Sequence, residues 1–225
     1  MIERLKRYRY AVLLAGLMLM LLSGPLVAFL GIGRGVLAVD VMNVLVFLFG
    51  LWSVARSRAA VHALWILCAS SLIAIAIVHT MGYGQFRGLA MLFMLIFFVW
   101  VLLMITKDII FGGDVTINRL IGAINVYLLL GLVWSICCSF VYMYDPDSFT
   151  GLRFAAQADE HLLLEFVYYS FVTLTTLGYG DITPVTSLSR TLAYLEAAIG
   201  QVYLTFLVAG LVGVHLAGRQ SREGQ

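Results

Sequence analysis

The chain has 225 residues, of which 62% are hydrophobic and only 12% are charged, and its mean hydropathy is +1.00. A soluble domain carries about twice that share of charged residues, because it must cover its surface with polar groups. A soluble globular domain is therefore excluded, and lipid is the indicated solvent. The net charge of +2 gives no indication of nucleic acid as a partner.

Apolar runs long enough for a helix to cross the hydrocarbon core, about 20 residues, predict six membrane spans. They are Tyr10–Gly31, Val36–Ala55, Val61–His79, Leu89–Thr106, Leu120–Met143 and Ser189–Ala217. The first run is longer than the apolar region of a secretory signal, and no small-residue cleavage site follows it. A further apolar stretch, Leu162–Leu177, is too short and too rich in threonine for a span, so we interpret it as re-entrant.

Basic residues predict the orientation, because cytoplasmic loops are enriched in Lys and Arg. With the N-terminus inside, ten of the 14 basic residues fall on the cytoplasmic side and four on the outside. Both termini are therefore expected in the cytoplasm, and the segment Tyr144–Leu188 faces outward. Its acidic side chains either concentrate cations or form an ordinary solvated loop. They include Asp145, Asp147, Asp159, Glu160 and Asp181.

The segment between the last two spans contains a motif with a specific backbone requirement. Residues Thr173–Asp181 read T-L-T-T-L-G-Y-G-D. An ion that leaves water needs fixed oxygens in place of its hydration shell, and consecutive backbone carbonyls supply them if they point the same way. Glycine allows the dihedral angles this needs, and Gly178 and Gly180 stand at alternate positions. One strand gives one column of oxygens, so several copies around an axis are required.

A second copy of the pattern shows that the motif alone is weak evidence. Thr80–Gly84 reads T-M-G-Y-G between the third and fourth spans. A full-length span precedes it, which leaves no residues for a separate short helix, and no acidic residue follows it. We interpret this copy as a turn.

In its full context the motif at Thr176–Gly180 resembles the pore of the potassium channel family. The resemblance covers about Leu120–Gly218: an outer helix, an acidic outer segment, a short helix, the filter, Asp181 and an inner helix. Leu177 stands where valine is commoner, with its side chain away from the ions. Together with the four N-terminal spans, Asn125–Leu130 and Pro146–Phe149 resemble a bacterial branch of the family.

The spans and the resemblance together predict an all-α integral membrane protein. It has six transmembrane helices, a re-entrant pore helix and a selectivity-filter loop, and it assembles as a homotetrameric pore. The expected domains are a four-helix transmembrane bundle (1–106), a cytoplasmic linker (107–119), a pore domain (120–218) and a short cytoplasmic tail (219–225). K⁺ is expected to bind at Thr176, Leu177, Gly178, Tyr179 and Gly180.

Residues before and after the filter are expected to support it. The pore helix, Leu162–Thr175, would direct its partially negative C-terminus toward the ion. Tyr168 and Tyr169 stand where the family has an aromatic pair behind the filter, although a membrane-interface role is the alternative. Thr175 ends the helix, and Asp181 either faces the outer mouth or bonds behind the filter.

The last span carries the expected gating and cavity residues. Gly200 lies twenty residues after Gly180, as the family's hinge glycine does, and close helix packing is the alternative. Glu196 needs a partner within the membrane, and we expect it to bond behind the pore helix. A stripe that repeats every four residues lines either the cavity or a packing core: Leu204, Val208, Val212 and Leu216.

The N-terminal spans give no sign of a voltage sensor. Leu89–Thr106 contains no charged residue, whereas voltage sensing requires several basic residues in one span. Weak or absent voltage dependence is therefore expected. Asp40, Asn43 and His79 are expected to form interhelical hydrogen bonds, with a pH-sensing or ligand role as the alternative.

The sequence thus predicts a passive, potassium-selective channel subunit in a bacterial cytoplasmic membrane, and not an enzyme. The cysteines Cys68, Cys137 and Cys138 lie in apolar runs without metal-type spacing, and no cofactor is expected besides the transported K⁺. The expected partners are lipid and further copies of the chain. The alternatives are a potassium-uptake transporter, which would need four filter loops in one chain, a weakly selective cation channel, and a receptor or scaffold.

Overall fold

A computed structural model describes residues 9–30, 87–111, 117–152 and 162–223, together with single positions between 62 and 73. The described part is almost entirely helical. Its helices are α2 (Arg9–Leu30), α5 (Arg87–Phe111), α6 (Ile117–Tyr144), α7 (Leu162–Leu174) and α8 (Ser187–Glu223). The prediction of a mostly helical fold is confirmed. The predicted span Val36–Ala55 lies outside the described residues, and Val61–His79 lies largely outside them.

Three of the described helices are long and apolar enough to cross a membrane. They are Gly88–Phe111, Ile117–Tyr144 and Ser187–Gly210, and each contains most of a predicted span. The apolar stretches Arg9–Leu22 and Leu162–Leu174 are shorter. Helix α7 has 13 residues and is therefore about 20 Å long, too short for a hydrocarbon core of about 30 Å.

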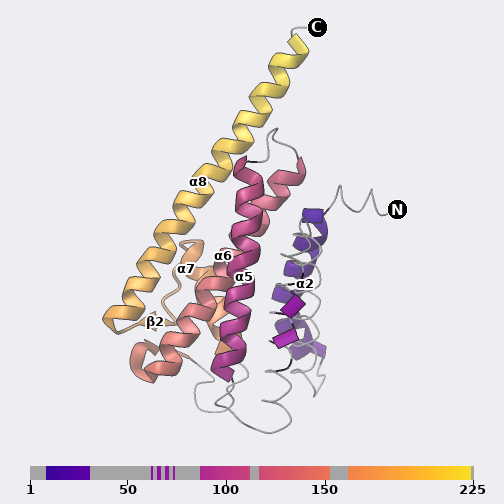
Figure 1. Cartoon of the computed structure of the whole chain (residues 1–225). Helices are drawn as coiled ribbons and strands as arrows, with labels where there is room; N and C mark the ends of the chain where they lie inside the picture. The colour runs from indigo at the N-terminus through magenta and orange to yellow at the C-terminus, as the bar shows by residue number, and fades with distance from the viewer. Residues whose placement is uncertain are drawn as a thin grey trace.

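Three helices are longer than the sequence pattern predicts. Helix α5 continues to Phe111 and α6 begins at Ile117, so both ends of the expected linker 107–119 are helical. Asp108 explains the first extension, because it faces α2 and pairs there with Arg9 and Tyr10. Helix α8 runs without interruption to Glu223, through most of the expected tail, and extends beyond the other helices (Figure 1).

Helix α6 lies at the centre of the described structure and packs against α2, α5, α7 and α8 (Figure 1). Its contacts with α2 and α5 form the main apolar core. Side chains that are at most 1% exposed form the centre of this core: Leu13, Leu17, Phe97, Phe98, Val101, Ile105, Leu129, Leu132 and Ile136. Because α6 also contacts α7 and α8, it connects the N-terminal helices with the segment that carries the filter motif.

Helix α8 is the least covered element. Val202, Phe206 and Val208 are each more than half exposed, with Phe206 at 73%. Exposed apolar area on this scale is typical of a surface that meets lipid or another protein copy.

A short turn and a two-stranded sheet connect the end of α6 with the residues after the filter motif. The 3₁₀ turn η2 (Pro146–Ser148) leads into strand β1 (Phe149–Thr150), which pairs antiparallel with β2 (Thr183–Pro184). The hydroxyls of Thr150 and Thr183 lie 2.8 Å apart. Gly151 has a φ of 89°, and an added Cβ there would lie 1.7 Å from the carbonyl oxygen of Asp181. Glycine is therefore required where the two segments touch.

Candidate functional site

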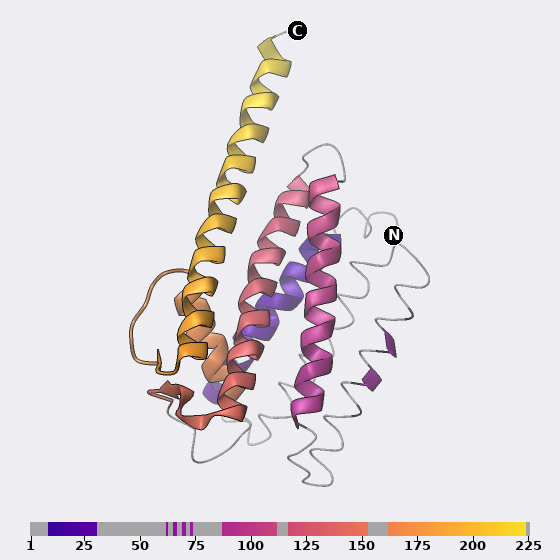
Figure 2. The ribbon, with the colours of Figure 1, turned by 60° about the vertical axis from the view of Figure 1, so that its left-hand side comes forward.

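The chain reverses direction around the filter motif. Helix α7 runs from the end of the molecule that holds η2 toward the middle, and the following loop returns to the same end, where α8 begins (Figure 2). The motif residues Thr176–Gly180 lie on this returning loop. A short helix followed by an extended return is the local geometry that the sequence predicts.

The loop has an alternating backbone. The residues with positive φ are Thr176 at 59°, Gly178 at 59° and Gly180 at 75°. The positive φ of both glycines agrees with the conformational requirement inferred from the motif. Thr176 was not expected to adopt this conformation, which costs a non-glycine residue about 1–2 kcal/mol, so its surroundings must hold it there.

Hydrogen bonds to α7 hold the loop. The amide of Thr176 donates to the Thr173 carbonyl at 2.9 Å, and the amides of Leu177 and Gly178 both donate to the Val172 carbonyl at 2.9 and 3.2 Å. Because N–H and C=O point in opposite directions across a trans peptide, the carbonyls of Thr176 and Leu177 are directed away from Val172. Two neighbouring oxygens therefore turn toward the side opposite α7.

That opposite side is open in the single chain. Residues 175–180 are all exposed, with Leu177 at 55% and Tyr179 at 67%. An added Cβ at Gly178 or Gly180 would meet no heavy atom within 4 Å. One chain therefore supplies a row of oxygens along one side only.

Tyr168 connects α7 with the residue that follows the motif. Its hydroxyl donates to Asp181 Oδ2 at 2.6 Å, and Asp181 Oδ1 accepts from the amide of Ile182 at 3.1 Å. A bond to a carboxylate is stronger than one between neutral groups. Tyr168 and Asp181 thus lie together, as expected for filter support, although the support itself stays a prediction.

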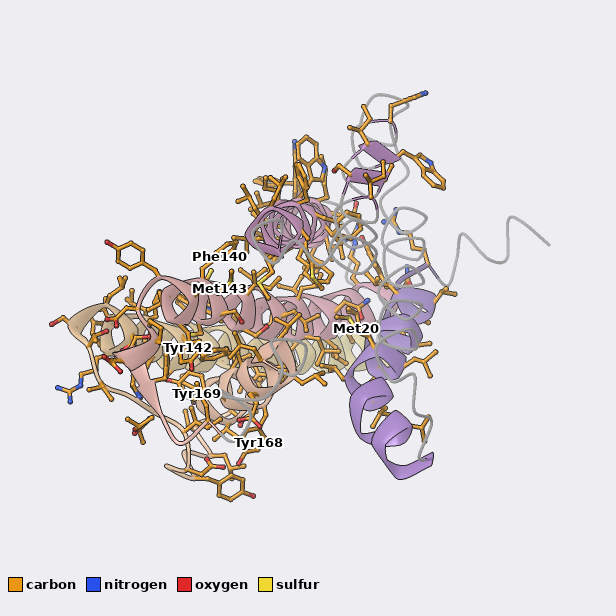
Figure 3. The ribbon with its side chains drawn as sticks, turned by 90° about the horizontal axis from the view of Figure 1, so that it is seen from below. Met20, Phe140, Tyr142, Met143, Tyr168 and Tyr169 are labelled. Atoms are coloured by element: carbon orange, nitrogen blue, oxygen red, sulfur yellow. The ribbon has the colours of Figure 1, made fainter. Side chains whose placement is uncertain are left out.

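Tyr169 lies elsewhere, in an aromatic cluster. Its ring centroid is 5.3 Å from that of Phe149 and 6.4 Å from that of Phe166. Tyr142 of α6 adds a tilted contact with Phe166 at 5.8 Å. Figure 3 shows Tyr142 and Tyr169 on the side of α6 away from α5, whereas Phe140 and Met143 face α5. Tyr169 therefore fastens α7 to β1 and not to the loop that carries the motif.

Three contacts fix the C-terminal end of α7. Thr175, the residue after α7, donates from Oγ1 to the Phe171 carbonyl of that helix at 2.6 Å. The Tyr127 hydroxyl of α6 donates to the Leu174 carbonyl at 3.2 Å. Gly200 of α8 lies so close that an added Cβ would be 2.6 Å from the same carbonyl oxygen. The position of Gly200 is therefore a close-packed one, and the hinge role stays a prediction.

The predicted cavity residues all lie on α8, in the part of the helix that the other described helices leave uncovered. Leu204 is partly buried, whereas Val208 and Val212 are more than half exposed. The side chain of Leu216 lies outside the described ones. The single chain places these residues on α8 without bringing them together.

Sequence reasoning missed several polar residues around the motif. Gln201 donates from Nε2 to Thr176 Oγ1 at 3.4 Å, and the Tyr203 hydroxyl donates to the Ala123 carbonyl at 2.6 Å. The rings of Tyr127 and Tyr203 stack at 6.1 Å between α6 and α8. The sequence did carry a signal for these contacts: a polar side chain inside an apolar span needs a hydrogen-bond partner, and Gln201 and Tyr203 both lie in such a span. The second copy of the motif, Thr80–Gly84, lies outside the described residues.

Comparisons with known proteins match the part of the chain that contains this loop, and each match covers less than half of the chain. Residues 126–215 match a family model described as ion channel. Two-pore potassium channel 4 of Arabidopsis thaliana is 32% identical over 87 residues, which are 39% of this chain and 28% of the relative. Two-pore potassium channel 5 of the same plant is 29% identical over 105 residues, or 47% of this chain and 22% of the relative.

A rice relative gives a similar result. Two pore potassium channel c of Oryza sativa subsp. japonica is 30% identical over 86 residues, which cover 38% of this chain and 16% of the relative. The matches thus span less than a third of the length of these relatives. They are matches to channels and not to enzymes. No solved structure matches the chain significantly.

Proposed function

We propose that the chain is a subunit of a passive, potassium-selective channel in which four copies of Thr176–Gly180 surround a common axis. The alternating backbone of this loop carries the proposal. Left-handed residues alternate, amides bond to α7, and carbonyls turn to the open side. The family match includes this loop, and the named relatives are potassium channels.

In this proposal K⁺ loses its water and is bound by oxygens of Thr176, Leu177, Gly178, Tyr179 and Gly180. The C-terminus of α7 adds partial negative charge near the ion. Tyr168, Thr175 and Asp181 support the loop, and Tyr169 acts through its contact with β1.

The assembly and the membrane arrangement belong to the same proposal. Four copies close the open side of the loop and cover part of the exposed face of α8, whose Leu204, Val208, Val212 and Leu216 line the inner cavity. The remaining apolar surface faces lipid in a cytoplasmic membrane. Six spans leave both termini inside the cell. The N-terminal bundle (1–106) surrounds a pore domain (120–218).

Cation flux into liposomes tests the proposal. The purified full chain is reconstituted with a K⁺ gradient, and uptake of K⁺, Rb⁺ and Na⁺ is compared. We expect flux of K⁺ and Rb⁺ but not of Na⁺, and native mass spectrometry should give four times the 24.9 kDa of the chain. Equal Na⁺ flux would overturn the selectivity, and absence of all flux would overturn the channel function.

A pair of glycine variants tests whether this loop is the filter. Gly178→Ala places a Cβ on a residue with a φ of 59°, which costs about 1–2 kcal/mol in each copy, and should abolish selective flux. Gly82→Ala makes the same change in the other copy of the motif and should leave the flux unchanged. The opposite outcome would place the filter at Thr80–Gly84.

A further inference from the structure

Glu196 is a buried acid that lies outside the proposed filter. It lies on α8, one turn before Gly200, and is 0% exposed. Its Oε1 is hydrogen bonded to the hydroxyl of Ser170 on α7, which is also 0% exposed. The same hydroxyl lies 2.7 Å from the carbonyl oxygen of Gly131 on α6. Three helices therefore meet at one serine oxygen.

Close packing makes this meeting possible. At Gly131 an added Cβ would lie 2.8 Å from the ring of Phe171, so α7 rests directly on the backbone of α6. Because the two helices are this close, the Ser170 hydroxyl lies within hydrogen-bonding distance of the Gly131 carbonyl oxygen.

The number of protons that these three groups can donate decides the protonation state of Glu196. A serine hydroxyl has one proton to donate, and a backbone carbonyl has none. If Glu196 were a carboxylate, Ser170 could satisfy either Gly131 or Glu196, and the other short contact would join two acceptors. If Glu196 is a neutral acid, it donates to Ser170, which donates to Gly131. Only the neutral form satisfies both contacts.

The surroundings favour the same form. Oε2 of Glu196 is buried without a hydrogen-bond partner in the described part of the chain. Among the described residues, the titratable groups found to interact with Glu196 are Tyr127, Cys137 and Cys138 on α6 and Tyr169 on α7, and none of these four is basic. Because the side chain is fully covered within one chain, another copy cannot contact it. An unpaired carboxylate in such a place is strongly disfavoured.

We infer that Glu196 is held as a neutral carboxylic acid whose proton completes a chain of hydrogen bonds from α8 through Ser170 of α7 to Gly131 of α6. It is a positioning residue: it holds α7 one turn before the end that carries the filter loop. The positioning role rests on the proposed channel function, whereas the neutral form does not.

Infrared spectroscopy of the purified full chain in lipid tests the neutral form without any flux. At neutral pH the wild-type spectrum minus that of Glu196→Gln should contain the C=O band of a protonated carboxylic acid. Ser170→Ala keeps Glu196 and should shift this band to higher frequency, because its hydrogen bond is lost. A difference spectrum with only carboxylate bands, or an acid band that Ser170→Ala leaves in place, would overturn the inference.

Flux measurements test the positioning role. Glutamine can donate to Ser170 as the neutral acid does, so Glu196→Gln should keep most of the K⁺ flux, while Glu196→Ala should lower it about tenfold. Ser139→Ala is the matched control, because Ser139 is equally buried but donates only to Ser135 of its own helix. It should conduct like the wild type, whereas Ser170→Ala should not. Equal flux in Glu196→Ala and the wild type would overturn the role.

Discussion

Two adjacent tyrosines of α7 have different surroundings, although the sequence treats them as a pair. Successive residues of a helix point about 100° apart, so Tyr168 and Tyr169 cannot contact the same surface. Tyr168 reaches Asp181 after the filter motif, and Tyr169 packs against Phe149. Of these two tyrosines, Tyr168 is the one that bonds to Asp181, the residue after the predicted filter.

This difference predicts a specific effect of Tyr168→Phe. The change removes the hydroxyl that donates to Asp181 and leaves the ring, at a cost of about 1.5–3 kcal/mol for a bond to a charged group. We expect the K⁺ current to decline about tenfold faster during sustained opening, measured in planar bilayers. Tyr144→Phe is the control, because Tyr144 is 90% exposed. An unchanged decline in Tyr168→Phe would show that the bond does not hold the filter.

At the scale of elements, α7 is held between α6 and α8 by glycines. Gly131 of α6 allows the ring of Phe171 to approach, and Gly200 of α8 allows the carbonyl of Leu174 to approach. In both places a methyl group would push a helix away. Two close contacts, one with α6 and one with α8, therefore determine where α7 and the loop after it lie.

A pair of alanine variants in α8 separates packing from bending at Gly200. A Cβ at Gly200 would lie 2.6 Å from the Leu174 carbonyl oxygen, whereas one at Gly210 would meet nothing within 4 Å. We expect Gly200→Ala to lower the thermal stability of the purified protein by several degrees. Gly210→Ala should leave stability equal or raise it, since alanine favours a helix by about 1 kcal/mol. If Gly200→Ala changes only channel opening and leaves stability intact, a hinge role is favoured.

At the scale of the whole molecule, the sequence predicts the elements better than their contacts. Span length and the threonine-rich interruption were sufficient to predict α5, α6, α7 and α8, because each signal lies within one segment. The positive φ of Gly178 and Gly180 follows from the motif, but that of Thr176 depends on bonds to α7. Glu196 was expected to bond behind the pore helix. That this partner is Ser170 depends on how α7 and α8 are aligned, and a pattern within one segment cannot predict that alignment.

The charge distribution of the whole chain predicts weak voltage dependence. None of the four N-terminal predicted spans contains Lys or Arg. In α5 the charged residues are Arg87, Lys107 and Asp108, all near its ends, and Asp108 is paired with Arg9. A charge that crosses the membrane field gains about 2.3 kcal/mol per 100 mV. Charges at the helix ends cross little of that field, so voltage supplies little energy for opening.

Macroscopic K⁺ currents recorded over a wide voltage range measure this property directly. We expect the conductance to change gradually, by about twofold or less per 100 mV, because no group of basic residues moves through the field. The same K⁺ concentration is used on both sides of the membrane, so that unequal concentrations do not cause rectification that resembles voltage-dependent opening. A steep sigmoidal conductance would contradict the prediction, and it would require mobile charge from residues that the first four spans do not contain. The N-terminal helices would then act on the pore through α6, which contacts α2, α5, α7 and α8.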